Sequence, residues 1–308
     1  MTVEVGSRRP DGPSPVAVRG ARVRARTAGL ARNLLAVPGV AWTVLFFLAP
    51  LGLLIVYSFG SVNLLTFKVQ FGWTLSNYSD IFQKLYLEPV LRSFALSAGA
   101  TLACLLIGFP VAFTIARARG RRQALLLLGV MIPFWTSFVV RTYGIYDVIN
   151  DNGPLYHLLH SLGLVHGYIH LLFTPVGVGI GIVYTYLPLM ILPLYVALER
   201  IDPALMEAAS DLGAKPWRVL RRVILPMAVP GIIAGCILVA IPATGEYVIP
   251  QILGGGTTLM FGNVVSDQFL NLGNYPFGAA LAVALTIVLM VVLVFLRSRS
   301  YKAEAAVA

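Results

Sequence analysis

The stretch Glu207-Ala208-Ala209-Ser210-Asp211-Leu212-Gly213 is a polar island in a chain that is otherwise rich in apolar residues, and Ile224-Leu225-Pro226 follows it. Just before the island, Asp202 is a favourable N-cap residue and Pro203 a favourable first residue of a helix. Gly213 is typical of the left-handed turn that ends a helix. The sequence therefore predicts a short helix, with one face made of Leu205, Ala208, Ala209 and Leu212. Because so short a helix is marginal alone in water, we expect it to pack against something else.

The composition around this island is that of a membrane protein. Hydrophobic residues make up 58% of the 308 residues and charged residues only 12%, whereas an average soluble domain has about 25% charged residues. The net charge of +10 has the sign expected of a nucleic-acid-binding protein. Most basic residues, however, lie in the N-terminal tail or at the ends of apolar runs, which excludes a nucleic-acid-binding face. Cys104 and Cys236 lie inside apolar runs and are interpreted as core residues without a disulfide.

Six segments are long and apolar enough to cross the hydrocarbon core as helices, which takes about 20 residues each. They are residues 38–60, 93–116, 123–143, 176–197, 223–248 and 278–297. The sequence therefore predicts an all-α membrane protein with six transmembrane helices.

The distribution of basic residues predicts how these helices are oriented. Arginine and lysine gather in both tails and in the second-to-third and fourth-to-fifth connections, whereas residues 144–175 and 250–277 contain none. Since basic residues favour the cytoplasmic side, both termini are predicted to be cytoplasmic. Residues 1–32, which have no apolar period, are predicted to be a disordered basic cytoplasmic tail, and residues 301–308 form a second cytoplasmic tail.

Closely spaced glycines predict tight helix packing in two of the segments. Gly177, Gly179 and Gly181 lie in the fourth segment, and Gly231 and Gly235 lie in the fifth. Such spacing lets a neighbouring helix come close. The neighbour is either another helix of this chain or a helix of a second subunit.

The Glu-Ala-Ala run, the glycine after it and the distal Ile-Leu-Pro resemble the cytoplasmic loop of the inner-membrane permeases of ATP-binding-cassette importers. The resemblance implies a type I importer permease fold, similar to that of methionine importers. Residues 33–300 would be the permease domain and residues 200–226 its coupling loop, located in a bacterial cytoplasmic membrane. The short helix would be a coupling helix that fits into a cleft of the ATPase subunit. An alternative interpretation is an ordinary amphipathic loop between two helices.

The resemblance also implies roles for particular residues of this loop. Glu207 would face basic groups of the ATPase, and Ala208 and Ala209 would form a small contact face. Gly213 would set the angle between the two helices of the loop. The full set implied to couple to the ATPase is Glu207, Ala208, Ala209, Asp211, Gly213, Leu225 and Pro226.

Several other segments, spread between about residue 38 and residue 300, resemble the spermidine/putrescine permeases in particular. They are residues 133–137 (Pro-Phe-Trp-Thr-Ser), 140–143 (Val-Arg-Thr-Tyr), 173–175 (Phe-Thr-Pro), 230–236, 245–250 (Gly-Glu-Tyr-Val-Ile-Pro), 261–265 and 274–280. The resemblance implies a non-catalytic subunit that forms the translocation pathway for a polyamine. Because related permeases share some of these segments, a different small solute is the alternative.

The resemblance further implies the partners of the chain. These would be an ATPase dimer, a second homologous permease subunit, an extracytoplasmic solute-binding protein and membrane lipid. ATP and magnesium would be held by the ATPase, so this chain would bind no cofactor itself. Whether the two permeases are copies of one chain or two different chains is left open.

Residues near the predicted outer ends of the spans have side chains that suit an amine. Glu246 has a carboxylate with Tyr247 beside it, and Trp135 and Tyr143 lie at the outer end of the third segment. A carboxylate attracts an ammonium group by charge, and an aromatic ring attracts it by cation–π contact. Asp267 would add a second carboxylate. Alternatively, Glu246 pairs with Arg141 as a structural ion pair and the aromatic residues form an interfacial belt.

Other classes of function have less support in the sequence. All four histidines lie within residues 157–170 and suggest zinc, but leucines at helical spacing among them favour an interfacial helix. No Gly-Lys-Ser/Thr loop for phosphate is present. A transporter driven by an ion gradient would need carboxylates near the middle of the membrane, which only Glu246 approaches. A membrane-embedded enzyme would need clustered catalytic side chains, which the loops lack.

Overall fold

The computed structural model describes residues 37–63, 69–165, 167 and 169–307, so the predicted tail over residues 1–32 lies outside the described part. The chain divides into two compact units, Met1–Val56 and Tyr57–Ala308, and each is described by itself. Among the described residues, five helices are long and apolar enough to cross a membrane. A bent pair of helices passes the same test as a sixth candidate. The described chain is mostly helical, as predicted.

The described part of the first unit belongs to one helix, Val37–Ser58. Within it, the π-helical turn η1 (Val44–Leu48) leads into α2 (Ala49–Ser58). Pro50 comes directly after this turn and has no N–H to give to the carbonyl four residues earlier. The π turn accommodates it because hydrogen bonds there reach back five residues, here from Ala49 N–H to Val44 O.

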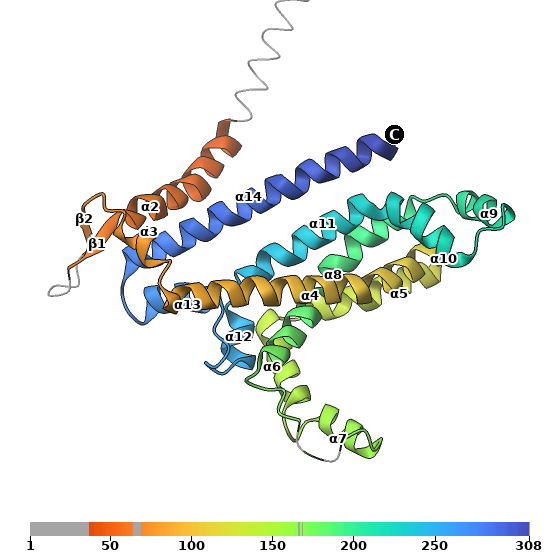
Figure 1. The fold of residues 1–308 in the computed structure, drawn as a ribbon, viewed down its shortest axis with the longest axis horizontal. Helices are drawn as coiled ribbons and strands as arrows, with labels where there is room; N and C mark the ends of the chain where they lie inside the picture. Colours follow the sequence, from red (N-terminus) through yellow and green to blue (C-terminus); the bar gives the residue numbers. More distant parts are fainter. Residues whose placement is uncertain (1–36, 64–68, 166, 168, 308) are drawn as a thin grey trace, which may run out of the picture. The chain divides into compact units, whose positions relative to one another are not determined.

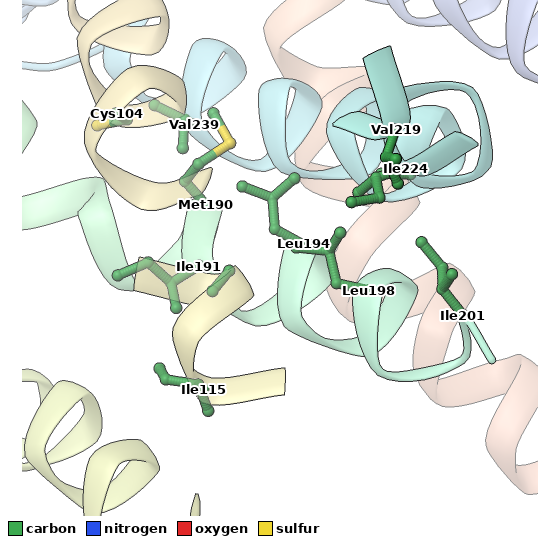
Figure 2. Packing of buried hydrophobic residues seen from close by; sticks show 12 residues of the cluster. Cys104, Ile115, Met190, Ile191, Leu194, Leu198, Ile201, Val219, Ile224 and Val239 are labelled. Carbon is green, nitrogen blue, oxygen red and sulfur yellow. The ribbon is translucent and has the colours of Figure 1, made fainter. Parts of the chain in front are cut away.

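Three long helices form the centre of the second unit: α4 (Lys84–Arg117), α8 (Pro175–Glu199) and α11 (Leu225–Thr244). They pack against one another, and α14 (Tyr275–Val307) packs against α11 (Figure 1). Met190, Leu194 and Leu198 of α8 are fully buried in the core that the three helices share (Figure 2). The last helix runs on to Val307, beyond the end predicted for it at residue 297.

The glycines of α11 allow it to lie close to α8. A Cβ placed on Gly235 would come within 2.6 Å of the sulfur of Met190, and one on Gly231 within 2.8 Å of the carbonyl oxygen of Pro193. At these two positions the close neighbour is therefore a helix of the same chain, which decides between the two alternatives left by the sequence.

A short antiparallel hairpin, β1 (Gly60–Val62) and β2 (Val69–Phe71), leads toward α3 (Ser76–Asp80). The buried Asn77 of α3 donates hydrogen bonds to the carbonyl oxygens of Ser58 and Gly60, at 2.9 and 2.8 Å. This asparagine joins α3 to the start of the hairpin.

The third predicted segment is bent, so the prediction of one continuous helix over residues 123–143 is wrong. Helix α5 (Arg121–Met131) passes into the 3₁₀ turn η2 (Ile132–Trp135), and α6 (Phe138–Ile149) then begins afresh, followed by α7 (Pro154–Ser161). The two halves meet at 96°. Pro133 cannot donate a backbone hydrogen bond, and Thr136 is extended, with its hydroxyl donating to Pro133 O at 2.7 Å.

Candidate functional site

Two regions contain most of the residues that the sequence singled out, and they lie at opposite ends of α11 (Figure 1). The first, residues 200–224, is called the α8–α11 loop. The second, residues 245–274, is called the α12–α13 segment. It contains α12 (Val248–Leu253) and α13 (Phe261–Leu270).

The α8–α11 loop contains the short helix predicted from the sequence, α9 (Pro203–Asp211), and then α10 (Pro216–Val219). The carboxylate of Asp202 caps α9 by accepting the N–H of Ala204 at 2.9 Å. Gly213 ends the helix with φ of 78°, and its N–H donates to Ser210 O at 2.9 Å. The predicted cap and stop of the helix are therefore confirmed.

Only part of the predicted face of α9 packs against the chain itself. Ala209, together with Met206, packs on the apolar core that α4, α8 and α11 share. In contrast, Leu205 is 46% exposed, Ala208 is exposed, and Leu212 is 90% exposed. A leucine that exposed on a short capped helix is an apolar surface that the described part of the chain leaves uncovered.

The charged residues of this loop are exposed as well. Glu207 and Asp211 are exposed, and neither forms a salt bridge with any other residue that the structure describes. Nearby, Trp217 of α10 is 69% exposed. The loop thus presents large apolar side chains with carboxylates beside them, and exposed apolar patches rimmed by polar residues often mark interaction sites.

Arg117, at the end of α4, ties the loop to the helical core. Its guanidinium donates to the carbonyl oxygen of Ile201 at 3.3 Å and to the sulfur of Met206 at 3.4 Å. It also lies 5.3 Å from the centre of the Phe113 ring. In the sequence Arg117 is only one of the basic residues of the second-to-third connection, and no local pattern shows that it reaches a residue 84 positions away.

The Ile-Leu-Pro that follows the loop shapes the start of α11. Residues Leu220–Ile224 form a second π turn, η3, in which Leu225 N–H donates to Leu220 O. Pro226 comes next, as Pro50 does after the first π turn. Ile224 is buried, Leu225 half-buried and Pro226 exposed. The motif therefore widens the helix where the loop enters α11.

At the other end of α11, the predicted span over residues 223–248 stops early, because α11 ends at Thr244. The carboxylate of Glu246 accepts the backbone N–H groups of Tyr247 and Val248 at 3.0 and 2.9 Å. In a continuous helix these two groups would bond to carbonyls four residues earlier, so the side chain competes with the helix and ends it.

Glu246 is almost fully enclosed, with 6% of its surface exposed. The hydroxyl of Tyr186 on α8 donates to its other carboxylate oxygen. Among the described residues no ion pair joins Glu246 to Arg141. The guanidinium of Arg141 instead lies 5.2 Å from the centre of the Phe134 ring.

The remaining predicted pathway residues are spread over several elements. Tyr247 is 37% exposed, Tyr143 of α6 is 55% exposed and Trp135 of η2 is 74% exposed. Helix α12, which begins two residues after Glu246, packs against both α8 and α6, the helix of Tyr143. Asp267 lies on α13 and accepts a hydrogen bond from Asn271 at 2.7 Å.

Two further polar residues hold the α12–α13 segment in place. Asn263 donates to Tyr247 O and to the side-chain oxygen of Gln251, both at 3.1 Å, and accepts the N–H of Met260 at 3.1 Å. Ser93 of α4 accepts the N–H of Phe261 at 2.7 Å. The sequence analysis missed both roles; the one available signal was a polar residue within an apolar stretch.

The histidine-rich stretch contains no metal cluster in the part that the structure describes, and His166 lies outside that part. His170 is 2.8 Å from Asp151 through its Nδ1 atom. Both cysteines are free thiols.

Several apolar helices of membrane-crossing length, two of them connected by a loop that contains a capped and exposed short helix, define a multi-pass membrane protein. The family model described as the inner membrane component of binding-protein-dependent transport systems matches residues 15–302. The chain belongs to this family and is therefore a multi-pass inner-membrane permease of an ABC importer, as the resemblance in its sequence implied.

Curated relatives cover most of the chain. The chain is 41% identical over 260 residues to the spermidine/putrescine transport system permease protein PotB of Escherichia coli (strain K12). The aligned residues cover 84% of this chain and 94% of the relative. The chain is 42% identical over 262 residues to the PotB protein of Haemophilus influenzae, covering 85% and 91% respectively.

The fold also matches a solved structure, that of a bacterial alginate ABC transporter in complex with alginate pentasaccharide-bound periplasmic protein. The TM-score is 0.70 at 16% identity, covering 91% of this chain and 96% of the other. At this identity the likeness concerns the fold alone, and it confirms the fold of an ABC importer permease.

Proposed function

We propose that the chain forms, with a second homologous permease subunit, the pathway through which an ATP-driven importer takes up spermidine or putrescine. The PotB relatives, which match nearly their whole length, support this class of solute. The family description supports delivery by a binding protein outside the membrane. In this proposal the chain is not an enzyme: ATP and magnesium are held by a separate ATPase dimer, and the chain binds no cofactor.

The single observation that supports coupling to an ATPase is the exposed surface of α9. Leu212 and Leu205 leave apolar area uncovered, and Glu207 and Asp211 add carboxylates with no salt bridge within the described residues. An acidic and apolar helix of this kind suits a cleft that has basic groups on its walls. Ala208, exposed and small, allows the wall of the cleft to come close.

The loop is also built to transmit a movement. Met206 and Ala209 seat α9 on the core of the chain, and Arg117 joins its start to α4. Gly213 sets the turn between α9 and α10, and Leu225 and Pro226 lie where the π turn meets α11. A pull on α9 would thus reach α4, α8 and α11 together.

We propose a topology of six spans, with the bent pair as the third and both termini in the cytoplasm. The arginine-rich connections support it, because the α8–α11 loop lies at the basic end and the α12–α13 segment contains no basic residue. A cysteine at exposed Leu212 should react with a membrane-impermeant maleimide only from the inside, and one at exposed Leu270 only from the outside. The reverse labelling would overturn this topology.

For the pathway we propose the charged residues Arg141 and Asp267 and the exposed aromatic residues Tyr247, Trp135 and Tyr143. Their rings offer cation–π contacts to an alkylammonium group.

The proposal is tested by uptake of labelled spermidine into vesicles that contain both permeases, the ATPase and the binding protein. Uptake should require ATP, stop with vanadate and disappear when the ATPase is left out. Uptake that continues on an ion gradient without the ATPase would identify a secondary transporter instead. ATP-dependent transport of another solute, with no uptake of spermidine, would overturn the polyamine assignment but not the class of importer.

A further inference from the structure

The carboxylate of Glu246 already has its hydrogen-bond partners within the chain. One oxygen accepts the N–H groups of Tyr247 and Val248, and the other accepts the hydroxyl of Tyr186. Only 6% of the residue is exposed. An ammonium group could reach the carboxylate only if the residues that enclose it moved apart, so the geometry does not suit direct contact with a solute.

The hydrogen bonds of Glu246 and Asn263 hold the backbone of Tyr247 on both sides. Its N–H is bonded to Glu246, and its carbonyl oxygen accepts from the side chain of Asn263 and from the N–H of Gln251, both at 3.1 Å. The peptide groups on either side of the residue are thus fixed, while its side chain remains partly exposed. The direction in which the Tyr247 ring points therefore depends on the two bonded side chains.

Glu246 also fixes α12 relative to α8. The bond to Tyr186 joins residues 60 positions apart. A Cβ on Gly181 of α8 would come within 2.8 Å of Ile249, which shows how closely the start of α12 lies against α8. Helix α8 leads directly into the α8–α11 loop. It therefore connects α9, the proposed docking helix, to Glu246.

We propose that Glu246 is a positioning residue: it caps the start of α12 and aims the ring of Tyr247 at the solute, without binding the solute itself. The inference rests on the proposed function for the identity of the solute as an amine. The group that meets the amine is then the aromatic ring, through a cation–π contact.

Two conservative substitutions of Glu246 separate positioning from binding by charge. Glu246→Gln keeps the length of the side chain and an oxygen that accepts the two backbone N–H groups, but it removes the charge. Glu246→Asp keeps the charge, but it is one methylene shorter and cannot reach both the amide groups and Tyr186.

The measurement is KM and maximal rate of spermidine uptake by the complete importer, compared at equal amounts of assembled complex. We expect Glu246→Gln to stay within about threefold of the original chain and Glu246→Asp to lose about tenfold or more in maximal rate. The proposal would be overturned if Glu246→Asp kept a KM and maximal rate near those of the original chain while Glu246→Gln had a KM raised about tenfold or more. The control is Glu88→Gln, which neutralises an exposed carboxylate outside the proposed pathway; it removes only the exposed ion pair with Arg92 and should leave both values unchanged.

A second measurement does not depend on the solute. Hydrogen–deuterium exchange of the Tyr247 and Val248 amides in the assembled importer should remain slow in Glu246→Gln and become about tenfold faster in Glu246→Asp. If the original chain takes up no polyamine, the proposed function fails while the exchange result still tests the cap. Equal exchange in the two variants would overturn the positioning role even if polyamine uptake is normal.

Discussion

The α8–α11 loop and the α12–α13 segment differ in where their polar groups find partners. In the loop, Glu207 and Asp211 are exposed and form no salt bridge within the described residues, and Leu212 is almost fully exposed. In the segment, Glu246 and Asn263 are buried and bonded within the chain. Exposed groups can bind a partner without loss of stability of the fold. Buried groups influence function by fixing the positions of other residues. A charged residue in a pathway region is therefore not by itself a ligand for the solute.

The largest effect should come from the exposed leucine of the loop. Leu212→Arg should weaken binding of the ATPase by about 2 kcal/mol or more, because a charge would enter a desolvated contact. The unfolding temperature of the chain should not change, since the side chain is 90% exposed. Co-purification of the ATPase measures the first quantity and thermal unfolding in detergent the second.

The matched control is Leu270→Arg in the α12–α13 segment, where the leucine is also exposed, at 74%. It should retain the ATPase fully. Equal loss of the ATPase in both variants would contradict the division of roles between the two regions.

In the α12–α13 segment the corresponding prediction concerns stability. Asn263→Ala leaves the side chain of Gln251 and the N–H of Met260 without their buried partner and Tyr247 O with one of its two donors, so we expect a loss of about 2 kcal/mol in the free energy of unfolding. ATPase binding should persist at temperatures where the variant is folded. Asn271→Ala, at an exposed asparagine of the same segment, should cost less than about 0.5 kcal/mol. Equal losses would show that the buried network does not hold the segment.

Arg117 tests whether the loop transmits force through α4. Arg117→Lys keeps a positive charge but cannot reach both Ile201 O and the sulfur of Met206, so about 1 kcal/mol of hydrogen bonding is lost. We expect ATP hydrolysis to continue while the solute moved per ATP falls about threefold. The exposed Arg119→Lys serves as control, and the same fall there would show that the bonds of Arg117 to the loop are not the cause.

The smallest effect should be that of Gly213→Ala. A φ of 78° costs a residue with a Cβ about 1 kcal/mol, and nothing lies within 4 Å of the position, so strain is the only penalty. Uptake should fall about twofold as the angle between α9 and α10 shifts. Gly129→Ala, at a helical glycine that also has open space around it, should have no effect. No change in Gly213→Ala would mean that the turn does not set the docking angle.

The short-range features of the molecule could be predicted, and they are concentrated in the loop. Asp202, Pro203 and Gly213 bound α9 because caps and stops act through neighbouring backbone groups. The candidate membrane spans could be predicted because each is an apolar run long enough to cross the hydrocarbon core. The bend at Pro133 was missed because hydropathy does not register a backbone that changes direction.

The class of protein and the loop that marks it could be predicted from the sequence, because the apolar spans, the cap and the motif all depend on residues close together in the chain. Three features required the packed fold: the face of α9 that remains exposed, the bonds of Arg117 to the loop, and the hydrogen-bond partners of Glu246. The bonds of Glu246 to Tyr186 and of Ser93 to Phe261 join residues 60 and 168 positions apart. Such pairs exist only once the helices have packed, because burial is what leaves a polar group in need of that particular partner.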